Sequence, residues 1–151
     1  MRLIGGSTPG RDEGPAVDTA PRFRGRVRVS FPAALSLRGL ESGNPAGRPH
    51  GHDFTAELVF ESTTLVYPGV VIDDDMRTEI ERHIADRLAY RYLDRLFDRP
   101  PTCEAIAEYL ANWHWCSARP PGHARLVAVN VSTGAGDHGE IHLPASTGAS
   151  A

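Results

Sequence analysis

The sequence predicts an α+β domain whose sheet is largely antiparallel. Two segments in the first half alternate apolar and polar residues, which is the period of a strand. Two segments in the middle repeat apolar residues at the helical period, and a Val-rich stretch and a shorter apolar one follow. The element order is therefore strand, strand, helix, helix, strand, strand, a pattern typical of helices grouped on one face of an antiparallel sheet.

The first strand is expected over residues 22–31. Its apolar face comprises Phe23, Val27, Val29 and Phe31, and its other face comprises Arg22, Arg24, Arg26 and Arg28. A face of four arginines has to be solvated or paired with carboxylates, because unpaired buried charge is costly.

The second strand is expected over residues 53–61. One face carries Phe54, Ala56, Leu58 and Phe60, and the other carries Thr55, Glu57, Val59 and Glu61. Between the two strands, residues 32–51 contain repeated Gly and Pro, which indicates an irregular loop. Loops of this length are often functional.

Two helices are expected next. The first spans residues 73–97, with Met76, Ile80, Ile84, Leu88 and Tyr92 four residues apart. Asp73, Asp74 and Asp75 suit the positive end of its dipole. Pro100 and Pro101 end this helix, and Thr102 is placed to cap a second one that runs to about Trp115.

The last two strands are expected over residues 126–133 and 140–143. The folded domain is therefore placed at 21–143. Residues 1–20 and 144–151 are rich in Gly, Pro, Ser and Ala without periodicity, so we expect a disordered leader and a disordered tail.

Composition narrows the function classes. All 16 positive charges are Arg, and the net charge of -3 argues against nucleic acid as a partner. The chain contains neither the apolar stretch of about 20 residues that spans a membrane nor the core of a signal peptide. The two cysteines form neither a disulfide framework nor a CxxC pair, so we expect a cytoplasmic protein.

His50, Gly51 and His52 form the first candidate for chemistry. Two histidines at i and i+2 entering a strand point to the same side, so both imidazoles can reach one metal ion. A zinc site needs three or four protein ligands, and an isolated HxH is more often a surface or hydrogen-bonded pair.

The context of this pair resembles a known family. Six stretches fall in order along the chain: FPAALSL (31–37), RPHGHDF (48–54), PGVVIDD (68–74), DRLAYRYLD (86–94), PPTCEAIAEYL (100–110) and VAVNVST (127–133). Together they resemble the 6-pyruvoyl-tetrahydropterin synthase / 6-carboxytetrahydropterin synthase family over residues 22–143.

The resemblance implies the tunnelling fold, in which a four-stranded antiparallel sheet carries two helices on one face. Subunits of that family join their sheets into a barrel, often a trimer that pairs into a hexamer. The arginine face of residues 22–28 would then line the tunnel and pair with Glu57 and Glu61.

The resemblance also locates the site. Its HGH histidines are present as His50 and His52, but the third zinc histidine of the family is replaced by Leu35 and the catalytic Cys by Ala46. The Asp-His pair of the family falls on Ala89 and Tyr90, and the Glu that anchors the pterin falls on Ser132 or Thr133.

These replacements predict a diverged member that lacks most of the catalytic residues and does not run the family's pterin reaction. We favour a lyase or cyclase of specialised metabolism acting on a small, less polar metabolite. Tyr90, His50 and His52 would serve as acid-base groups, and the altered positions Leu35, Ala46, Ala89, Ser132 and Thr133 would contact the substrate. No cofactor is expected, although His50 and His52 leave zinc open.

Two alternatives remain open at this stage. One is a pseudoenzyme that binds a ligand or serves assembly. The other is a zinc-dependent hydratase or hydrolase with a substituted third ligand. Asp53, Arg91, Asp94, Asp137, His138 and Glu140 are further candidates, each of a type that is more often a surface charge. Cys103 begins the second helix, where we expect it to pack.

Overall fold

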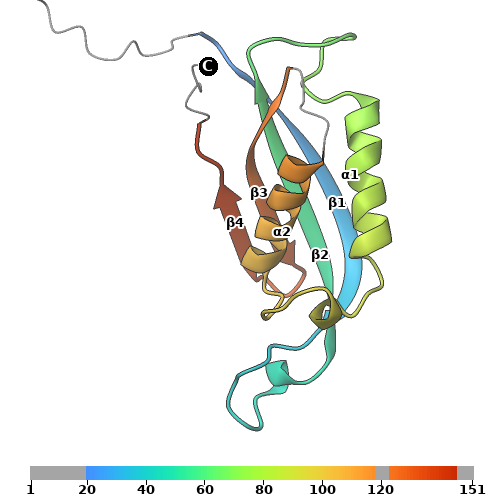
Figure 1. Cartoon of the computed structure of the whole chain (residues 1–151), viewed down its shortest axis with the longest axis vertical. Helices are drawn as coiled ribbons and strands as arrows, with labels where there is room; N and C mark the ends of the chain where they lie inside the picture. Colours follow the sequence, from blue (N-terminus) through green and yellow to red (C-terminus); the bar gives the residue numbers. More distant parts are fainter. Residues whose placement is uncertain (1–19, 118–122, 146–151) are drawn as a thin grey trace, which may run out of the picture.

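A computed structural model describes residues 20–117 and 123–145 of the chain. Its sheet contains β1 (Phe23–Leu35), β2 (His50–Ser62), β3 (Arg125–Thr133) and β4 (His138–His142), in the order β1-β2-β3-β4 with every neighbouring pair antiparallel (Figure 1). The predicted α+β class is confirmed. Apart from Ala20, Pro144 and Ala145, the expected leader and tail lie outside the described residues.

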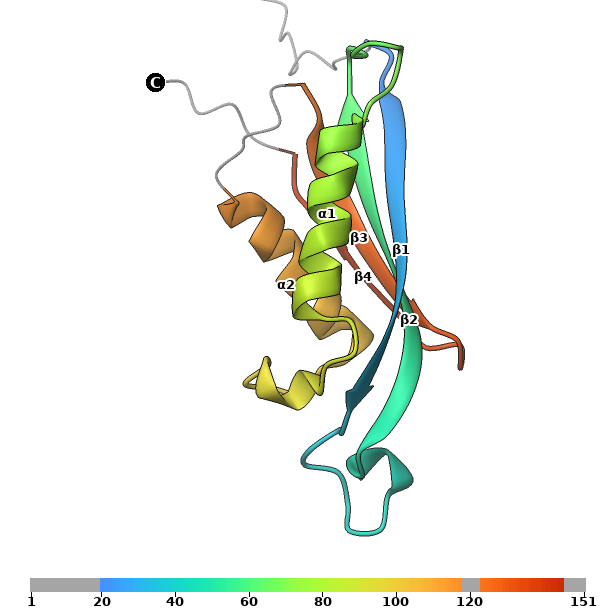
Figure 2. The ribbon, with the colours of Figure 1, turned by 90° about the vertical axis from the view of Figure 1, so that its right-hand side faces the viewer.

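Both helices cover the same face of the sheet. The helix α1 (Asp74–Arg87) lies along β1, and α2 (Cys103–Cys116) lies against β3 and β4, as the edge-on view in Figure 2 shows. Each helix begins where the sequence predicts. The Asp73 side chain accepts a hydrogen bond from the Met76 amide at 2.8 Å, and Thr102 accepts one from the Ala105 amide at 3.3 Å.

The first two strands are longer than the alternation predicts. They continue in register past Phe31 and Phe54 to the pair Leu35 and His50. Pro32 is compatible with this extension because β1 is an edge strand, where a missing amide donor is tolerated. The HGH segment therefore belongs to β2, and only residues 36–49 form the loop, which projects beyond the sheet (Figure 1).

The expected long helix over 73–97 is wrong in its second half, because α1 ends at Arg87. Tyr90 has a φ of 57°, and its amide donates to the carbonyl of Pro32 at 2.7 Å. The amide of Ala34 in turn donates to the carbonyl of Arg91 at 2.9 Å. The chain therefore leaves the helix to hydrogen-bond with the free edge of β1, and these tertiary bonds prevail over the helical spacing.

The core lies between the inner face of the sheet and the two helices. Phe54, Leu58 and Phe60 from β2 meet Ile80 and Ile84 from α1, all with 1% exposure or less. Each such side chain contributes roughly 1.5–3 kcal/mol by leaving water. These positions are the apolar ones of the predicted period, which is why both helices cover this face.

The outer face of the sheet carries the predicted arginines, and they are paired. Glu57 accepts from Arg28 at 2.7 Å and lies 3.5 Å from Arg26. Glu61 accepts from Arg22 at 2.9 Å and from Arg24 at 3.0 Å. The pairing expected for Glu57 and Glu61 is therefore present within one chain.

An aromatic stack joins the two helices. The His83 ring of α1 lies parallel to the Trp113 ring of α2 at a centroid distance of 3.8 Å, and its Nε2 hydrogen-bonds with the Tyr109 hydroxyl at 3.0 Å. Burial, together with the charge of Arg87, lowers the pKa of His83 to about 4. The stack therefore holds a neutral imidazole at neutral pH.

Among the described residues, neither helix has the length and apolar character needed to cross a bilayer.

Candidate functional site

The two histidines lie on the inner face of the sheet, next to Leu35. The register pairs Leu35 with His50, and residues two apart on a strand point to one side, so Leu35, His50 and His52 share the face of Phe54. The rings of His50 and His52 are 4.8 Å apart between centroids. The structure thus places the predicted pair together, with the hydrocarbon side chain of Leu35 opposite.

The hydrogen bond of His50 fixes its tautomer. Its Nδ1 lies 2.8 Å from the carbonyl oxygen of Arg48, and a carbonyl can only accept, so we assign the proton to Nδ1. The Nε2 atom then has a free lone pair. This nitrogen can accept a proton or bind an electrophile.

A cavity of about 240 Å³ opens in front of this pair. Its apolar wall consists of Leu35, Leu37, Phe54 and Pro101, and its polar wall consists of His50, His52, Thr102, Cys103, Glu104, Thr133, Asp137 and His138. The cavity therefore lies between the ends of β1 and β2, the start of α2 and the turn between β3 and β4. It combines apolar contact area with groups that can transfer protons.

Close backbone packing positions Glu104, and hydrogen bonds position Asp137. Gly139 of β4 lies so near the start of α2 that a Cβ there would meet the Glu104 amide nitrogen at 2.5 Å. Asp137 is held by Thr133, whose Oγ1 accepts from the Asp137 amide at 3.2 Å and donates to Oδ2 at 3.3 Å. Sequence reasoning named Asp137 and His138 without placing them, and missed Glu104, because nothing in the sequence shows that these elements converge.

Cys103 contributes a buried, protonated thiol to this cavity. Its side chain is buried, and burial, with the charges of Glu104 and Asp137, raises the pKa of the thiol to about 11. The thiol stays protonated at neutral pH, in keeping with the packing role expected from the sequence.

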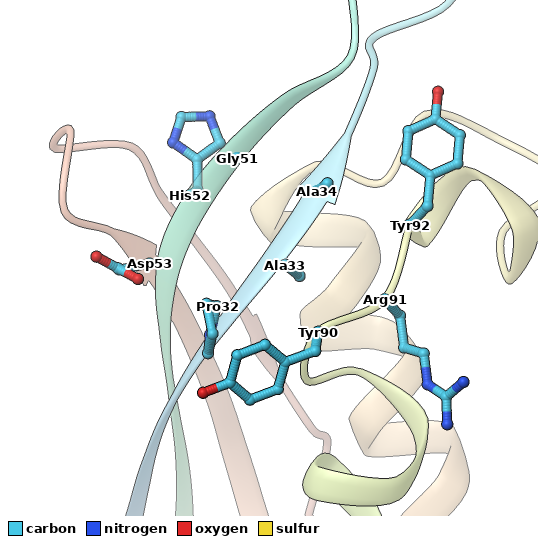
Figure 3. Close-up of a pocket in the computed structure, with 9 residues that line it drawn as sticks. All are labelled: Pro32, Ala33, Ala34, Gly51, His52, Asp53, Tyr90, Arg91 and Tyr92. Carbon is cyan, nitrogen blue, oxygen red and sulfur yellow. The ribbon is translucent and has the colours of Figure 1, made fainter.

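Tyr90 lies elsewhere within the chain. With 87% of its surface exposed, it lines a second, open hollow of about 670 Å³ together with His52, Asp53, Arg91 and Tyr92 (Figure 3). Figure 3 also shows the side chain of Arg91 directed away from β1 and β2. Of the three predicted acid-base residues, His52 lines both spaces, His50 the cavity and Tyr90 the hollow.

The predicted substrate-contact positions are divided. Leu35 and Thr133 line the cavity. Ser132 lies on the opposite face of β3, in register with Thr55. Ala46 lies in a short 3₁₀ helix (Pro45–Gly47) and accepts from the Leu37 amide at 2.8 Å, whereas Ala89 packs against the core. Ala46, Ala89 and Ser132 line neither of these two spaces.

The donor set does not fit a zinc ion within one chain. Zinc sites in proteins use three or four ligands, and here the place next to His50 and His52 is filled by Leu35, which has no donor atom. Across the described residues, 20–117 and 123–145, no three His, Cys, Asp or Glu side chains gather in a way that could hold a metal ion.

The fold and site define a class: a small α+β domain with a cavity between its sheet and a helix, lined by histidines and carboxylates. A sequence model of the 6-pyruvoyl tetrahydropterin synthase family matches residues 25–139, so the chain belongs to that family. Its fold is the tunnelling fold predicted from the motifs.

Solved structures support this fold. The 6-pyruvoyl tetrahydropterin synthase of Caenorhabditis elegans is 18% identical with a TM-score of 0.69, and the match covers 82% of this chain and 97% of that one. An uncharacterized protein from Wolinella succinogenes is 15% identical with a TM-score of 0.68, covering 82% and 99%. A catalytic-residue mutant of the Plasmodium vivax synthase is 14% identical with a TM-score of 0.54, covering 83% and 99%. Identities this low mark a diverged member.

Proposed function

We propose that this protein is an enzyme that has diverged from the family's pterin reaction and acts as a lyase or cyclase of specialised metabolism. Its substrate would be a small, less polar metabolite bound in the cavity next to His50 and His52. One observation carries the proposal: imidazoles and carboxylates from three separate parts of the chain converge on a cavity with an apolar wall.

The chemistry suits such a cavity. In an elimination, a base takes a proton from carbon while the bond to the leaving group breaks, and an acid protonates the departing atom. The free Nε2 of His50 would be the base and take the proton from carbon as the double bond forms, and His52, in ring contact with it, would donate its own proton to the departing atom. A proton passed from His50 to His52 would then restore both rings. Tyr90 would donate to a ligand that extends past His52, since both line the hollow beside β1.

The replaced positions support divergence from the pterin reaction. Leu35 cannot bind a metal ion, and Ala46 and Ala89 cannot take or orient a proton. Their side chains are apolar, which suits a ligand held by shape. The zinc-dependent hydratase or hydrolase would need a third donor from outside this chain, so the acid-base mechanism is preferred.

The assembly is part of the proposal. The sheet has two edges, β1 and β4, and the segment around Tyr90 bonds to β1 only at Pro32 and Ala34 among the described residues. The rest of β1 and the edge of β4 are ready to pair with another strand. We propose a cytoplasmic homo-oligomer, a trimer or hexamer, in which β1 of one copy pairs with β4 of the next to close a barrel. The paired arginines of the outer face would line its interior.

A ligand-binding pseudoenzyme is the second candidate. The altered positions Leu35, Ala46 and Ala89 favour it, because they remove proton-transfer and metal-binding groups while the fold persists. It predicts binding in the same cavity without turnover.

The test uses the purified full chain and a small-molecule extract of cells from the source organism. Mass spectrometry should show one compound consumed and a product formed catalytically, in excess over protein. The variants His50→Gln and His52→Gln should lower the rate at least 100-fold, whereas His142→Gln on the exposed side of β4 should not change it. Depletion that stops at one equivalent, without product, would support the pseudoenzyme and overturn the lyase or cyclase.

A further inference from the structure

We infer that the cavity selects a ligand with a protonated amine on a small apolar body, and that it rejects anionic ligands. The inference deepens the proposed function. It rests on that proposal in one respect, namely that the same cavity is the ligand site. It adds the chemical class of the ligand, because the histidines alone do not indicate which charge the ligand carries.

The charges that line the cavity have one sign. Glu104 and Asp137 contribute two carboxylates, and none of the lining residues is an arginine. The chain contains no lysine, so no described side chain brings a permanent positive charge to this space. A phosphate or carboxylate placed here would meet two like charges, whereas an ammonium group would be attracted by both.

These carboxylates are also free to bind. Among the described residues, neither Glu104 nor Asp137 has a cation within ion-pair distance, in contrast to Glu57 and Glu61 on the outer face. Asp137 accepts from Thr133 through Oδ2, and its Oδ1 accepts from no described residue. The carboxylates of Glu104 and Asp137 also act on the cavity interior, because both help to raise the pKa of the Cys103 thiol that lines it.

The approach to the cavity has the same sign. A neighbouring hollow shares Thr102 and Glu104 with the cavity and is further lined by Glu108 and Glu140. Arg99 and Glu108 pair with each other, and Glu140 lies 3.0 Å from His142 Nε2 and 3.4 Å from His138 Nε2. The hollow therefore has two carboxylates, Glu104 and Glu140, beyond its one arginine pair. A surface of like charge raises the local concentration of oppositely charged ligands and repels the others.

The apolar wall limits the rest of the ligand. Leu35, Leu37, Phe54 and Pro101 can only offer surface contact, so the body of the ligand has to be hydrocarbon or aromatic. The volume of about 240 Å³ is below that of cavities for drug-sized molecules, which leaves room for about one ring and a short arm.

Three probes of one shape test the inference: benzylamine, benzyl alcohol and benzoate, cationic, neutral and anionic at pH 7.5. Each is titrated into the full chain at low salt while the amide signals of Gly51, Thr133 and Gly139 are followed by NMR. Benzylamine should bind at least tenfold more tightly than benzyl alcohol, and benzoate should give no saturable shift.

The variant Glu104→Gln/Asp137→Asn should bring benzylamine to the affinity of benzyl alcohol and leave benzyl alcohol unchanged. The control Glu41→Gln/Glu81→Gln removes the same net charge from exposed positions away from the cavity and should leave the tenfold preference intact. The inference would be overturned if benzoate bound as tightly as benzylamine or if no probe bound saturably. It would also be overturned if both double variants lost the same affinity for benzylamine. These titrations involve no turnover, so their failure is distinguishable from failure of the proposed reaction.

Discussion

The outer face of the sheet and the cavity on its inner face use charged groups in opposite ways. On the outer face, Glu57 and Glu61 are held by arginines of the neighbouring strand. In the cavity, Glu104 and Asp137 lie beside His50 and His52 without a described cation. Charges satisfied within the chain support the fold, and charges left without an internal partner are available to a ligand. The two carboxylates of the outer face therefore stabilise the sheet, whereas the two of the cavity can contact a ligand.

The largest expected effect comes from converting the cavity into a metal site. Leu35→His would place a third imidazole beside His50 and His52, and we expect about one zinc per chain by elemental analysis, against well below one for the unaltered chain. Ala34→His is the matched control, because residue 34 points to the opposite face. Equal zinc in the unaltered chain and Leu35→His would mean that another donor already completes the site.

The outer face is tested by Glu57→Gln. Burial opposes the charge of Glu57, but hydrogen bonds from Arg28 and Asn130 and the charges of Arg28 and Arg26 outweigh it and lower its pKa below 4.5. We expect a loss of about 1–2 kcal/mol in the free energy of unfolding at pH 7, measured in urea. A carboxyl whose pKa is lowered by folding stabilises above its unfolded pKa, so the difference should fade as the pH falls below 4.5. Glu41→Gln, in an exposed loop, should change stability by less than about 0.5 kcal/mol.

A smaller, pH-dependent effect is expected from the stack between the helices. Folding lowers the pKa of His83 from 6.5 to about 4, so the unfolded chain binds the proton more readily and stability falls as the pH drops through that range. His83→Gln should flatten the slope of unfolding free energy against pH between these values. The exposed His142→Gln should leave the slope as it is, and an unchanged slope in His83→Gln would contradict the assignment.

The smallest effect concerns the Cys103 thiol. Because Glu104 and Asp137 help to raise its pKa, Glu104→Gln/Asp137→Asn should increase its rate of alkylation by iodoacetamide at pH 9 a few-fold. The measurement needs a Cys116→Ser background, since Cys116 is exposed. If the rate does not change, the two carboxylates do not act on the cavity interior.

Much of the fold is readable from the sequence, because alternation and helical spacing report on burial directly. The period alone places Phe54, Leu58, Ile80 and Ile84 on apolar faces, and all four are buried in the core. The second half of the predicted long helix failed for a tertiary reason. The chain around Tyr90 bonds to the edge of β1, and no local pattern shows that this edge is within reach.

The site was predictable only in part. The alternation places His50 and His52 on one face, but it cannot show what faces them. Glu104 and Asp137 line one cavity because the start of a helix packs on a strand glycine far along the chain. The alternation of β3 shows which of Ser132 and Thr133 lines the cavity. Thr133 does, because it is in register with the inward-facing Phe54.

The closeness of Gly139 to the start of α2 has a consequence for genetics. Any side chain at position 139 would have to displace the backbone of Glu104, and position 139 follows Asp137 by two residues. In a screen for alleles that lose activity yet still accumulate as folded protein, we expect Gly139→Ala to be recovered, whereas changes at the buried Phe60 should be lost through degradation. The added methyl group of Gly139→Ala would thus cause loss of activity with the protein still present, whereas changes at Phe60 would cause loss of the protein itself.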